Sequence, residues 1–419
     1  MMSCYGFISE IVFSLARPYL YHKYSEGNEQ RYGHFANDIA RGALWVHAVS
    51  VGEVQSAAPF IKQLKTSLPE RPVLLSTITE TGKKMASQLV GDLAQHIYYP
   101  WDAPSIVKRT LNTLHPTVYF AFEREIWPEL LNQLNKRDIP AFLVNGRLSE
   151  STYKKLSRCP KFWSKVYNAF KLVLTRSDIE RDRFIGLGVE PQKVLVTGDC
   201  KVDALIERKN SCDVSEVKRF LPDDAPIILA GSTHEGEEPI VLEAFSVLRK
   251  QFANLRLVIV PRHPERAFAI QTEAVNVGLN AVLLSTCTMY DWQVLVVDRI
   301  GMLFQLYGCV KAAFIGGSIA LKGGQNIMEP AIWGIPFCQG PDYRDFTEAT
   351  EKLTSAGLCS IVHDAKEMRV FFETILTEND KDRYQEGSRK FFAQLGGASR
   401  RSWEYIQHVL EFSASRGNE

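Results

Sequence analysis

The chain has 419 residues, more than a single hydrophobic core usually organises, so two domains are expected. Its 49 basic and 48 acidic residues nearly cancel, so no general positive field is present and no nucleic-acid partner is expected. Eight scattered cysteines without a C-x-x-C pair favour reduced thiols in a cytosolic protein over a disulfide framework or a zinc site.

The N-terminal segment 1–24 is predicted to form a helix that does not cross a bilayer. Residues 4–20 are largely apolar, but Glu10 and Arg17 interrupt them and Pro18 is expected to break the helix. Neither a basic start nor a small-residue cleavage site indicates a signal peptide. Two interpretations stay open: a helix that lies on a membrane surface, or a helix packed on the neighbouring domain.

Short apolar runs then alternate with amphipathic segments along nearly the whole chain. Continuous β-branched runs without strict alternation are typical of parallel strands that are covered on both faces. Helical segments between them indicate doubly wound α/β sheets. Strands are predicted at 43–50, 72–79, 96–100, 117–123, 140–146, 172–177 and 194–199, and again at 226–232, 255–261, 294–298, 312–318, 335–340 and 358–364.

A polar, charged stretch at 206–221 separates these two series of strands and is the predicted linker. We therefore predict one Rossmann-like domain at 25–205 and a second at 222–395, facing a central cleft, with a C-terminal helix at 396–419 that could pack on either. Ligands bind beyond the carboxyl ends of strands in such sheets, so the chemistry is expected there.

Two acidic motifs follow predicted strands in the first half. Glu53, in HAVSVGEV, could act as a general base, or it could simply favour the first turn of a helix. Glu123 and Glu125, in FEREIWPE, could orient acceptor hydroxyls or fix a cationic neighbour. Alternatively, one of them caps a helix and the other pairs with Arg124 or Arg147.

Two motifs in the second half suit anions. Thr233 and His234 lie in a turn whose free backbone N–H groups could bind phosphate, although a helix cap is the ordinary alternative. Arg262, His263 and Arg266 follow the next strand, where guanidinium groups could hold phosphate or carboxylate.

A glycine-rich region follows the strand at 312–318 and is the strongest indication of a nucleotide site. Glycine pairs at 316–317 and 323–324 let the backbone approach a ligand closely. Asn326 could cap a helix or meet phosphate, and Glu329 could accept ribose hydroxyls. No metal-binding motif, Walker loop or G-x-S-x-G element is present, so no metal site and no α/β-hydrolase is predicted.

These motifs, in this order, resemble those of the 3-deoxy-D-manno-octulosonic acid (Kdo) transferases of lipopolysaccharide biosynthesis. The resemblance covers about residues 31–360. It rests on S-V-G-E (50–53), E-x-E-x-W-P (123–128), S-T-H-E-G-E-E (232–238), P-R-H-P-E-R (261–266), G-G-S (316–318) and G-G-x-N-x-x-E-P (323–330), with smaller matches at 77–82, 145–149 and 197–203.

The resemblance implies a GT-B fold and an inverting transfer from CMP-Kdo to a lipid A precursor, without an obligatory metal or other cofactor. It also implies a location on the cytoplasmic face of the inner membrane, either peripheral or anchored by the N-terminus. The alternatives are another GT-B nucleotide-sugar enzyme, such as a transferase or epimerase with a non-lipid acceptor, and a non-catalytic module that binds CMP or a glycolipid.

The family pattern also implies roles for single residues. Glu53 matches the general base; the residues that match the donor-binding region are Thr233, His234, Arg262, Gly317, Ser318, Asn326 and Glu329, and those expected to bind or orient the acceptor are Glu123, Glu125 and Lys201. Three positions depart from the pattern: Met302 and Glu129 replace the family's Glu and Asn, and Gln325 replaces its His, which puts details of donor contacts and acceptor range in doubt.

Overall fold

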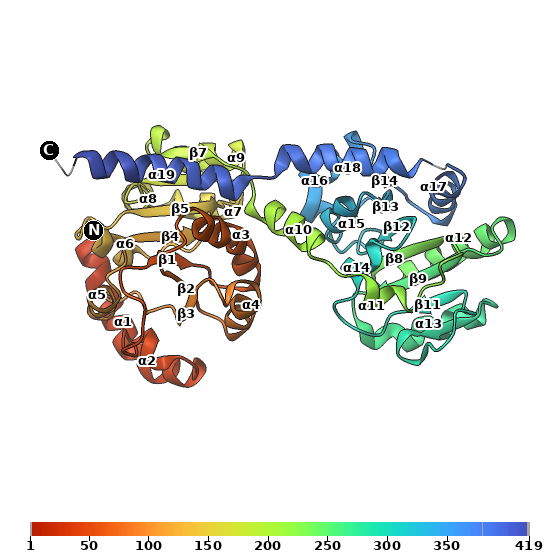
Figure 1. Ribbon diagram of the computed structural model, residues 1–419, viewed down its shortest axis with the longest axis horizontal. Helices are drawn as coiled ribbons and strands as arrows, with labels where there is room; N and C mark the ends of the chain where they lie inside the picture. The colour runs from red at the N-terminus through yellow and green to blue at the C-terminus, as the bar shows by residue number, and fades with distance from the viewer. Residues whose placement is uncertain (1, 379, 417–419) are drawn as a thin grey trace. The chain divides into compact units, whose positions relative to one another are not determined.

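The computed structural model describes residues 2–378 and 380–416, and the chain divides into two compact units (Figure 1). Unit 1 combines Met1–Glu207 with Leu395–Glu419, and unit 2 is Arg208–Gln394. Each unit contains a seven-stranded sheet whose strands all pair in parallel, so the predicted α/β class with two Rossmann-like folds is confirmed. The predicted linker segment 206–221 is partly helical, and a helix runs across the boundary between residues 207 and 208.

The sheet of unit 1 has the strand order β3-β2-β1-β4-β5-β6-β7. Its central strands are buried along their whole length, which explains why the sequence there lacks the alternation of a half-exposed strand. Every run predicted in the first half forms one strand. The strands are β1 (Leu44–His47), β2 (Val73–Thr77), β3 (Gln95–Tyr98), β4 (Val118–Phe122), β5 (Ala141–Gly146), β6 (Leu172–Thr175) and β7 (Val194–Val196).

Helices cover both faces of this sheet and enclose one apolar cluster on each side. One face carries α3 (Val51–Ser67), α4 (Glu80–Val90) and α19 (Ala398–Arg416), and the other carries α5 (Pro104–Leu114), α6 (Pro128–Asn135) and α8 (Pro160–Tyr167). Unit 1 also contains α1 (Met2–Lys23), α2 (Asn28–Arg31), α7 (Glu150–Leu156) and α9 (Asp178–Gly186), and α10 (Cys200–Asn210) begins in unit 1 and ends in unit 2.

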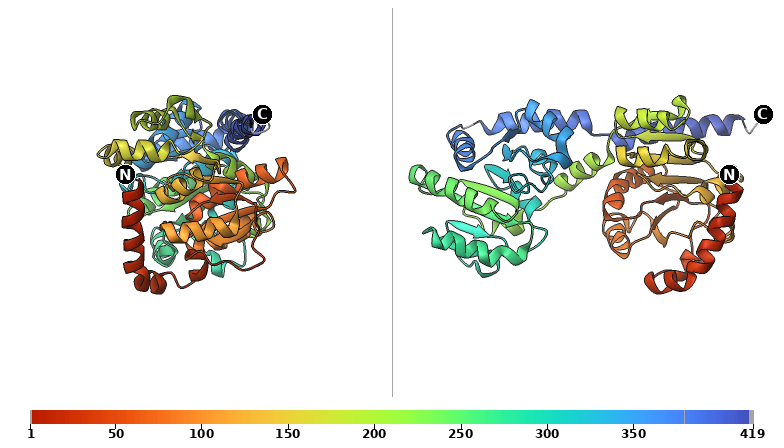
Figure 2. Two further views of the ribbon diagram at one scale, coloured as in Figure 1. Left: turned by 90° about the vertical axis from the view of Figure 1, so that its left-hand side faces the viewer. Right: turned by 180° about the vertical axis from the view of Figure 1, so that it is seen from behind.

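Helix α1 lies along the outside of unit 1 against α5 and α6 (Figure 2). Its inner face is packed: the Tyr5 hydroxyl donates to Asp102 (2.9 Å), and the ring of Phe13 stacks on Trp101 at 5.8 Å. The prediction that Pro18 breaks this helix is wrong, because α1 continues to Lys23. Proline removes one backbone hydrogen bond, and the packing of the inner face outweighs that loss.

The outer face of α1 is apolar as well as exposed. Its exposed side chains recur at helical spacing and are Phe7, Ile8, Ile11, Val12, Leu15 and Tyr19. Even so, none of the helices within residues 2–378 and 380–416 has the length and apolar character needed to pass through a bilayer. Packing of the helix on the neighbouring domain is therefore confirmed, and contact of its exposed face with a membrane stays a prediction.

The C-terminal helix α19 belongs to unit 1, although the chain before it belongs to unit 2. Asp203 of α10 holds its start by accepting the backbone N–H groups of Gly397 (2.6 Å) and Ser399 (2.7 Å). Trp403 and Ile406 are buried in the same apolar cluster as α3. The sequence left the packing partner of this helix open, and these contacts identify it.

The sheet of unit 2 has the order β10-β11-β9-β8-β12-β13-β14. Every run predicted in the second half forms one strand, and the short β10 was not predicted. The strands are β8 (Ile227–Thr233), β9 (Arg256–Pro261), β10 (Ala281–Leu283), β11 (Val294–Val296), β12 (Ala312–Ile315), β13 (Phe337–Gln339) and β14 (Cys359–Ile361).

The helices of unit 2 also flank the sheet on both faces. Buried apolar residues of α12 (Glu237–Gln251), α13 (Ala267–Asn276) and α17 (Ala365–Thr377) form one cluster with strand residues. The other helices are α11 (Ser215–Lys218), α14 (Leu303–Tyr307), α15 (Met328–Trp333), α16 (Thr347–Ser355) and α18 (Lys381–Leu395).

Candidate functional site

In both sheets the polar motifs lie near the point where successive strands of the chain begin to be added on the opposite side of the first strand. In unit 1 this point lies between β1 and β4, and in unit 2 it lies between β8 and β12. Ligands of open parallel sheets bind beyond the carboxyl ends of strands at such switch points. The predicted acidic motifs follow β1 and β4, the two predicted anion-binding motifs follow β8 and β9, and the glycine-rich motif follows β12.

Glu53 is the third residue of α3, in the turn that follows β1. Its Oε2 atom accepts the backbone N–H groups of Val49 (2.6 Å) and Ser50 (3.4 Å), so the side chain closes the start of its own helix. The side chain is buried, with 6% of its surface exposed. Its second oxygen, Oε1, accepts no hydrogen bond from the part of the chain that the structure describes. Glu53 thus stabilises the first turn of its helix, which was one of the two interpretations of the sequence, while its Oε1 atom has no partner among the described residues.

Glu123 comes directly after β4 and is held from several sides. Its Oε1 atom accepts the hydroxyl of Ser56 (3.1 Å) and pairs with Nζ of Lys201 (2.9 Å). The backbone of Glu123 has φ of +56°, a left-handed conformation that costs energy for a residue with a side chain. Glu123 therefore does fix a cation, but this cation is Lys201 rather than Arg124 or Arg147.

Glu125 completes a group of like charges that we call the carboxylate cluster: Glu53, Glu123 and Glu125. Burial raises the pKa of Glu125 to about 7, and the negative charge of Glu53 adds to this rise. Burial also raises the pKa of Glu53, against the lowering effect of the hydrogen bond from Val49. Carboxyl groups with raised pKa values at a strand end are suited to exchange protons near neutral pH.

In unit 2, the loop 316–320 after β12 is wrapped around one side chain that sequence reasoning missed, Glu237. The carboxylate of Glu237 is fully buried and accepts the backbone N–H groups of Gly317 (2.8 Å), Ser318 (3.0 Å), Ile319 (2.9 Å) and Ala320 (3.2 Å). It also accepts the N–H of His234 (2.9 Å), a group that was predicted to be free for an anion. The geometry of this loop is thus set from inside the protein. The S-T-H-E-G-E-E motif contains Glu237, but the sequence did not indicate this role.

Two other residues of this region that were predicted to bind the sugar donor, Ser318 and Thr233, are buried. Ser318 is fully buried; its hydroxyl donates to the carbonyl of Ile315 and accepts the N–H of Gly340, both at 2.7 Å. Thr233 is also fully buried, and its hydroxyl has no hydrogen-bond partner among the described residues. Direct contact of these two side chains with a donor remains a prediction.

The basic and polar side chains at the ends of β8 and β9 do come together. The rings of His234 and His263 lie 6.1 Å apart, and Nε2 of Gln325 lies 3.4 Å from Nε2 of His234. Burial lowers the pKa of His234, and the neighbouring charge of Arg262 adds to this lowering. The backbone N–H of Arg262 donates to the carbonyl of Thr233 (3.0 Å), which ties the two motifs together.

Asn326 and Glu329 lie at the start of α15. Asn326 precedes the N-cap residue Ile327 and accepts the N–H of Met328 (3.2 Å), the first residue of the helix. Glu329 pairs with Arg208 (2.9 Å), whose guanidinium group stacks 3.8 Å from the ring of Phe304. Burial raises the pKa of Glu329, and Arg208 opposes this rise.

The three departures from the family pattern lie in different environments. Gln325 is next to His234 in the donor region, whereas Met302 is buried at the start of α14. Glu129 is buried in α6, where it accepts hydrogen bonds from the side chains of Asn132 (3.3 Å) and Gln133 (2.8 Å). Of the three, only Gln325 therefore touches a predicted donor residue. No group of three His, Cys, Asp or Glu side chains suited to a metal ion occurs among the residues described.

Comparison with known proteins agrees with this arrangement. A family model described as 3-deoxy-D-manno-octulosonic-acid transferase (kdotransferase) matches residues 26–204. The 3-deoxy-D-manno-octulosonic acid transferase of Haemophilus influenzae is 28% identical over 395 residues, covering 93% of this chain and 92% of that protein. The protein of the same name from Aquifex aeolicus is 29% identical over 351 residues, covering 84% and 90%.

Solved structures share the fold at low sequence identity. The UDP-GlcNAc 2-epimerase from Neisseria meningitidis, bound to UDP-GlcNAc, has a TM-score of 0.61 at 16% identity and covers 87% of this chain and all (100%) of that one. A glycosyltransferase from Rickettsia africae has a TM-score of 0.56 at 14% identity, covering 88% and 99%.

These likenesses and the two seven-stranded parallel sheets confirm the predicted GT-B type of fold. In sequence, the chain is similar to Kdo transferases, which are glycosyltransferases, over most of its length, as its motifs predicted.

Proposed function

We propose that this chain transfers Kdo from CMP-Kdo to a lipid A precursor, with inversion at the anomeric carbon. An acceptor hydroxyl attacks that carbon, its proton passes to Glu53, and CMP leaves with the electrons of the broken bond. The proposal is supported by the 3-deoxy-D-manno-octulosonic acid transferase of Haemophilus influenzae, which is similar to this chain over nearly its full length.

The observation that carries this proposal is the uncommitted Oε1 atom of Glu53. One oxygen is anchored by backbone N–H groups, so the carboxylate is held in place while the other oxygen is available to a proton. The raised pKa brings Glu53 closer to the pH at which it would work, and a general base is most effective there. Glu123 and Lys201 then fall to the acceptor side, where they would orient hydroxyl groups.

Unit 2 would hold the donor. Arg262 and Lys322 supply positive charge near His234, which suits a ligand with one phosphate and one carboxylate. Cationic side chains can stabilise departing CMP without a metal ion, so we propose a metal-independent transfer. The apolar outer face of α1 would bring the enzyme to the cytoplasmic surface of the inner membrane, where a lipid acceptor lies.

The test is a defined reaction. Purified protein is incubated with CMP-Kdo and a lipid A precursor, with and without EDTA, and the products are analysed by mass spectrometry. The expected result is a mass increase of the acceptor by whole Kdo residues, at the same rate with EDTA. Absence of product, together with turnover of a UDP-sugar, would replace this proposal with another nucleotide-sugar activity.

A further inference from the structure

The ion pair between Arg208 and Glu329 connects the predicted donor region to a residue that the sequence did not single out. Arg208 lies in the last turn of α10, and Glu329 lies in the first turn of α15. Nη1 of Arg208 is 2.9 Å from Oε1 of Glu329. The other oxygen, Oε2, accepts no hydrogen bond from the described residues, so the carboxylate can still receive a ligand.

The guanidinium group of Arg208 is fixed by a second contact. It stacks on the ring of Phe304 in α14, with 3.8 Å between the guanidinium carbon and the ring centroid. Phe304 is buried, and its ring lies 5.5 Å from that of Trp333, the last residue of α15. A guanidinium group that is already stacked loses little further freedom when it binds a carboxylate. Packing therefore holds Arg208 at the point from which it orients Glu329.

The loop before α15 brings Glu329 to the switch point of its sheet. Gly323 and Gly324 both have φ of +84°, a left-handed conformation that favours glycine. The N–H of Gly324 donates to the carbonyl of Gly317 (3.0 Å), and the N–H of Gly323 donates to Asp342 (2.8 Å). The chain thus returns to the loop after β12 just before α15 begins, at the edge where a nucleotide is expected.

The charge of Glu329 depends on Arg208. Only 20% of the Glu329 side chain is exposed, and burial raises its pKa, whereas Arg208 lowers it. From α14 comes the phenol of Tyr307, whose pKa is raised by burial and by the charge of Glu329. From α18 comes the uncharged hydroxyl of Ser388, which donates to the carbonyl of Ala331. Arg208 is therefore the cation that opposes protonation of this carboxylate.

We propose that Arg208 is a positioning residue for the sugar donor: it keeps the Glu329 carboxylate charged and turned so that it accepts both hydroxyl groups of the donor's ribose. An ionised carboxylate has about four lone-pair sites and no donor, and Arg208 occupies one of them. A protonated carboxyl group carries a donor hydrogen on one oxygen and loses part of this capacity. The inference rests on the proposed function in one respect, since that function makes the donor a ribonucleotide.

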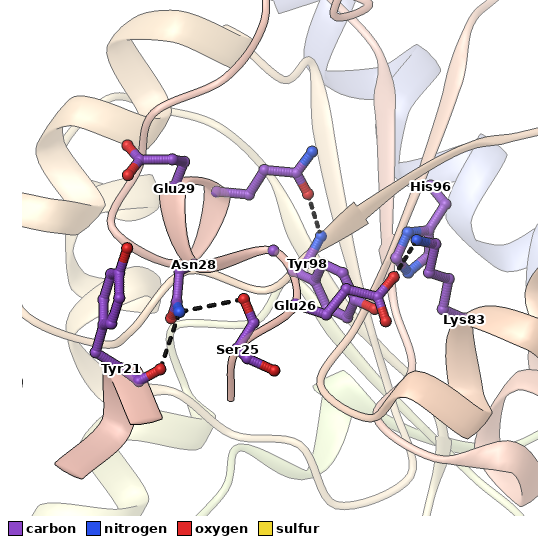
Figure 3. A pocket seen from close by; sticks show the side chains of 10 residues that line it. Tyr21, Ser25, Glu26, Asn28, Glu29, Lys83, His96 and Tyr98 are labelled. Atoms are coloured by element: carbon purple, nitrogen blue, oxygen red, sulfur yellow. Dashed lines mark hydrogen bonds and ion pairs between the residues drawn. The ribbon is translucent and has the colours of Figure 1, made fainter. Parts of the chain in front are cut away.

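An exposed ion pair in unit 1 supplies the matched control. Lys83 and Glu26 line a pocket of about 550 Å³ beside the end of α1 (Figure 3). Their side chains are 40% and 42% exposed, and the hydrogen bond from Lys83 lowers the pKa of Glu26. Water can replace Lys83 at this carboxylate, so Lys83→Gln removes an ion pair without leaving a buried charge.

The test is calorimetry of nucleotide binding by the full chain, between about pH 5 and pH 9. Each protein is titrated with CMP and with 2′-deoxy-CMP, and the ratio of the two Kd values measures recognition of the 2′-hydroxyl group. Protonation of the nucleotide phosphate or of His234 affects both ligands alike and cancels in this ratio. The variants are Arg208→Gln, Arg208→Lys, Glu329→Gln and the control Lys83→Gln.

The wild type and Lys83→Gln are expected to bind CMP about tenfold more tightly than the deoxynucleotide, as one hydrogen bond to a charged group predicts. As the pH falls, Arg208→Gln should lose this preference earlier than the wild type, because Glu329 takes up a proton more easily without its partner. Arg208→Lys should keep the preference, since it keeps the charge. In Glu329→Gln the ratio should be low at every pH, and adding Arg208→Gln should change it no further.

Three results would overturn the inference: no ribose preference in the wild type, an unchanged preference in Arg208→Gln at every pH, or an equal loss of affinity for both nucleotides in that variant. Titration with UMP and 2′-deoxy-UMP separates the inference from the proposed function. An Arg208-dependent preference found only with the uridine nucleotides would keep the inference and contradict CMP-Kdo as the donor. If the wild type binds none of these nucleotides, both fail.

Discussion

Two buried glutamates occupy similar places in the two units and are used in opposite ways. Glu53 lies in the first turn of α3 after β1, and Glu237 lies in the first turn of α12 after β8. Glu237 uses both oxygens to accept five backbone N–H groups, whereas Glu53 uses only Oε2 and keeps Oε1 available. A carboxylate that is saturated by N–H groups organises a loop, and one that keeps an oxygen free next to like charges can take up a proton.

The largest expected effect is that of Glu53→Gln. Its amide oxygen still accepts the N–H of Val49, but the amide cannot take a proton at neutral pH. We expect kcat to fall by about 10²–10⁴-fold, the usual contribution of a general base, with an unchanged Kd for CMP measured by calorimetry. If Glu53→Gln turns over at nearly the wild-type rate, Glu53 has only a structural role, as Glu237 does.

The next effect concerns stability in unit 2. Glu237→Ala leaves five buried N–H groups without an acceptor, and we expect the free energy of unfolding to fall by about 3 kcal/mol or more in urea titrations. The neighbouring exposed Glu235→Gln is the control and should change it by less than about 0.5 kcal/mol. If both variants unfold alike, the loop does not depend on this carboxylate.

A smaller effect comes from the carboxylate cluster and depends on pH. The folded protein raises the pKa of Glu125 from 4.5 to about 7, so between these pH values Glu125 is protonated in the folded state and ionised in the unfolded chain. The contribution of Glu125 to stability is therefore complete below about pH 4.5 and is lost as pH rises through 7. Glu125→Gln should gain about 2–3 kcal/mol over the wild type between pH 5 and pH 8.

The measurement is urea unfolding at both pH values, with the exposed Glu70→Gln as control. A constant difference between Glu125→Gln and the wild type across this range would contradict the raised pKa. The comparison of variant with wild type also removes the contribution of Asp102, a buried carboxyl in the same unit whose pKa is raised to about 6.

Most of the fold could be predicted because parallel strands buried on both faces leave a strong apolar signal. The strand β10 at the edge of its sheet was missed, although other strands of three residues, such as β7 and β14, were predicted. Pro18 misled the prediction because local propensity was outweighed by packing against α5 and α6. The place of α19 could not be derived locally, since Asp203 caps it from a distant part of the chain.

The candidate site also contains residues that the sequence predicted and one whose role it did not predict. Glu53 and Glu123 were found because they lie in the segments that follow strands, and strand ends of one sheet meet at one edge. Lys201, which pairs with Glu123, was found through the resemblance to the Kdo transferases. The role of Glu237 could not be found, because its N–H donors come mainly from a loop that folds against it only in the finished structure. Spacing along the chain shows which residues reach the edge of a sheet, but not which of their atoms are already occupied.

The return of α19 to unit 1 has a consequence for how the protein is made. The N-terminal unit lacks the helix that buries Trp403 and Ile406 on it until the whole of unit 2 has been synthesised. On the ribosome, the later unit can complete its core first, while the earlier one waits with an apolar face open to water. Chaperone binding during translation is therefore expected on the surface later covered by α19.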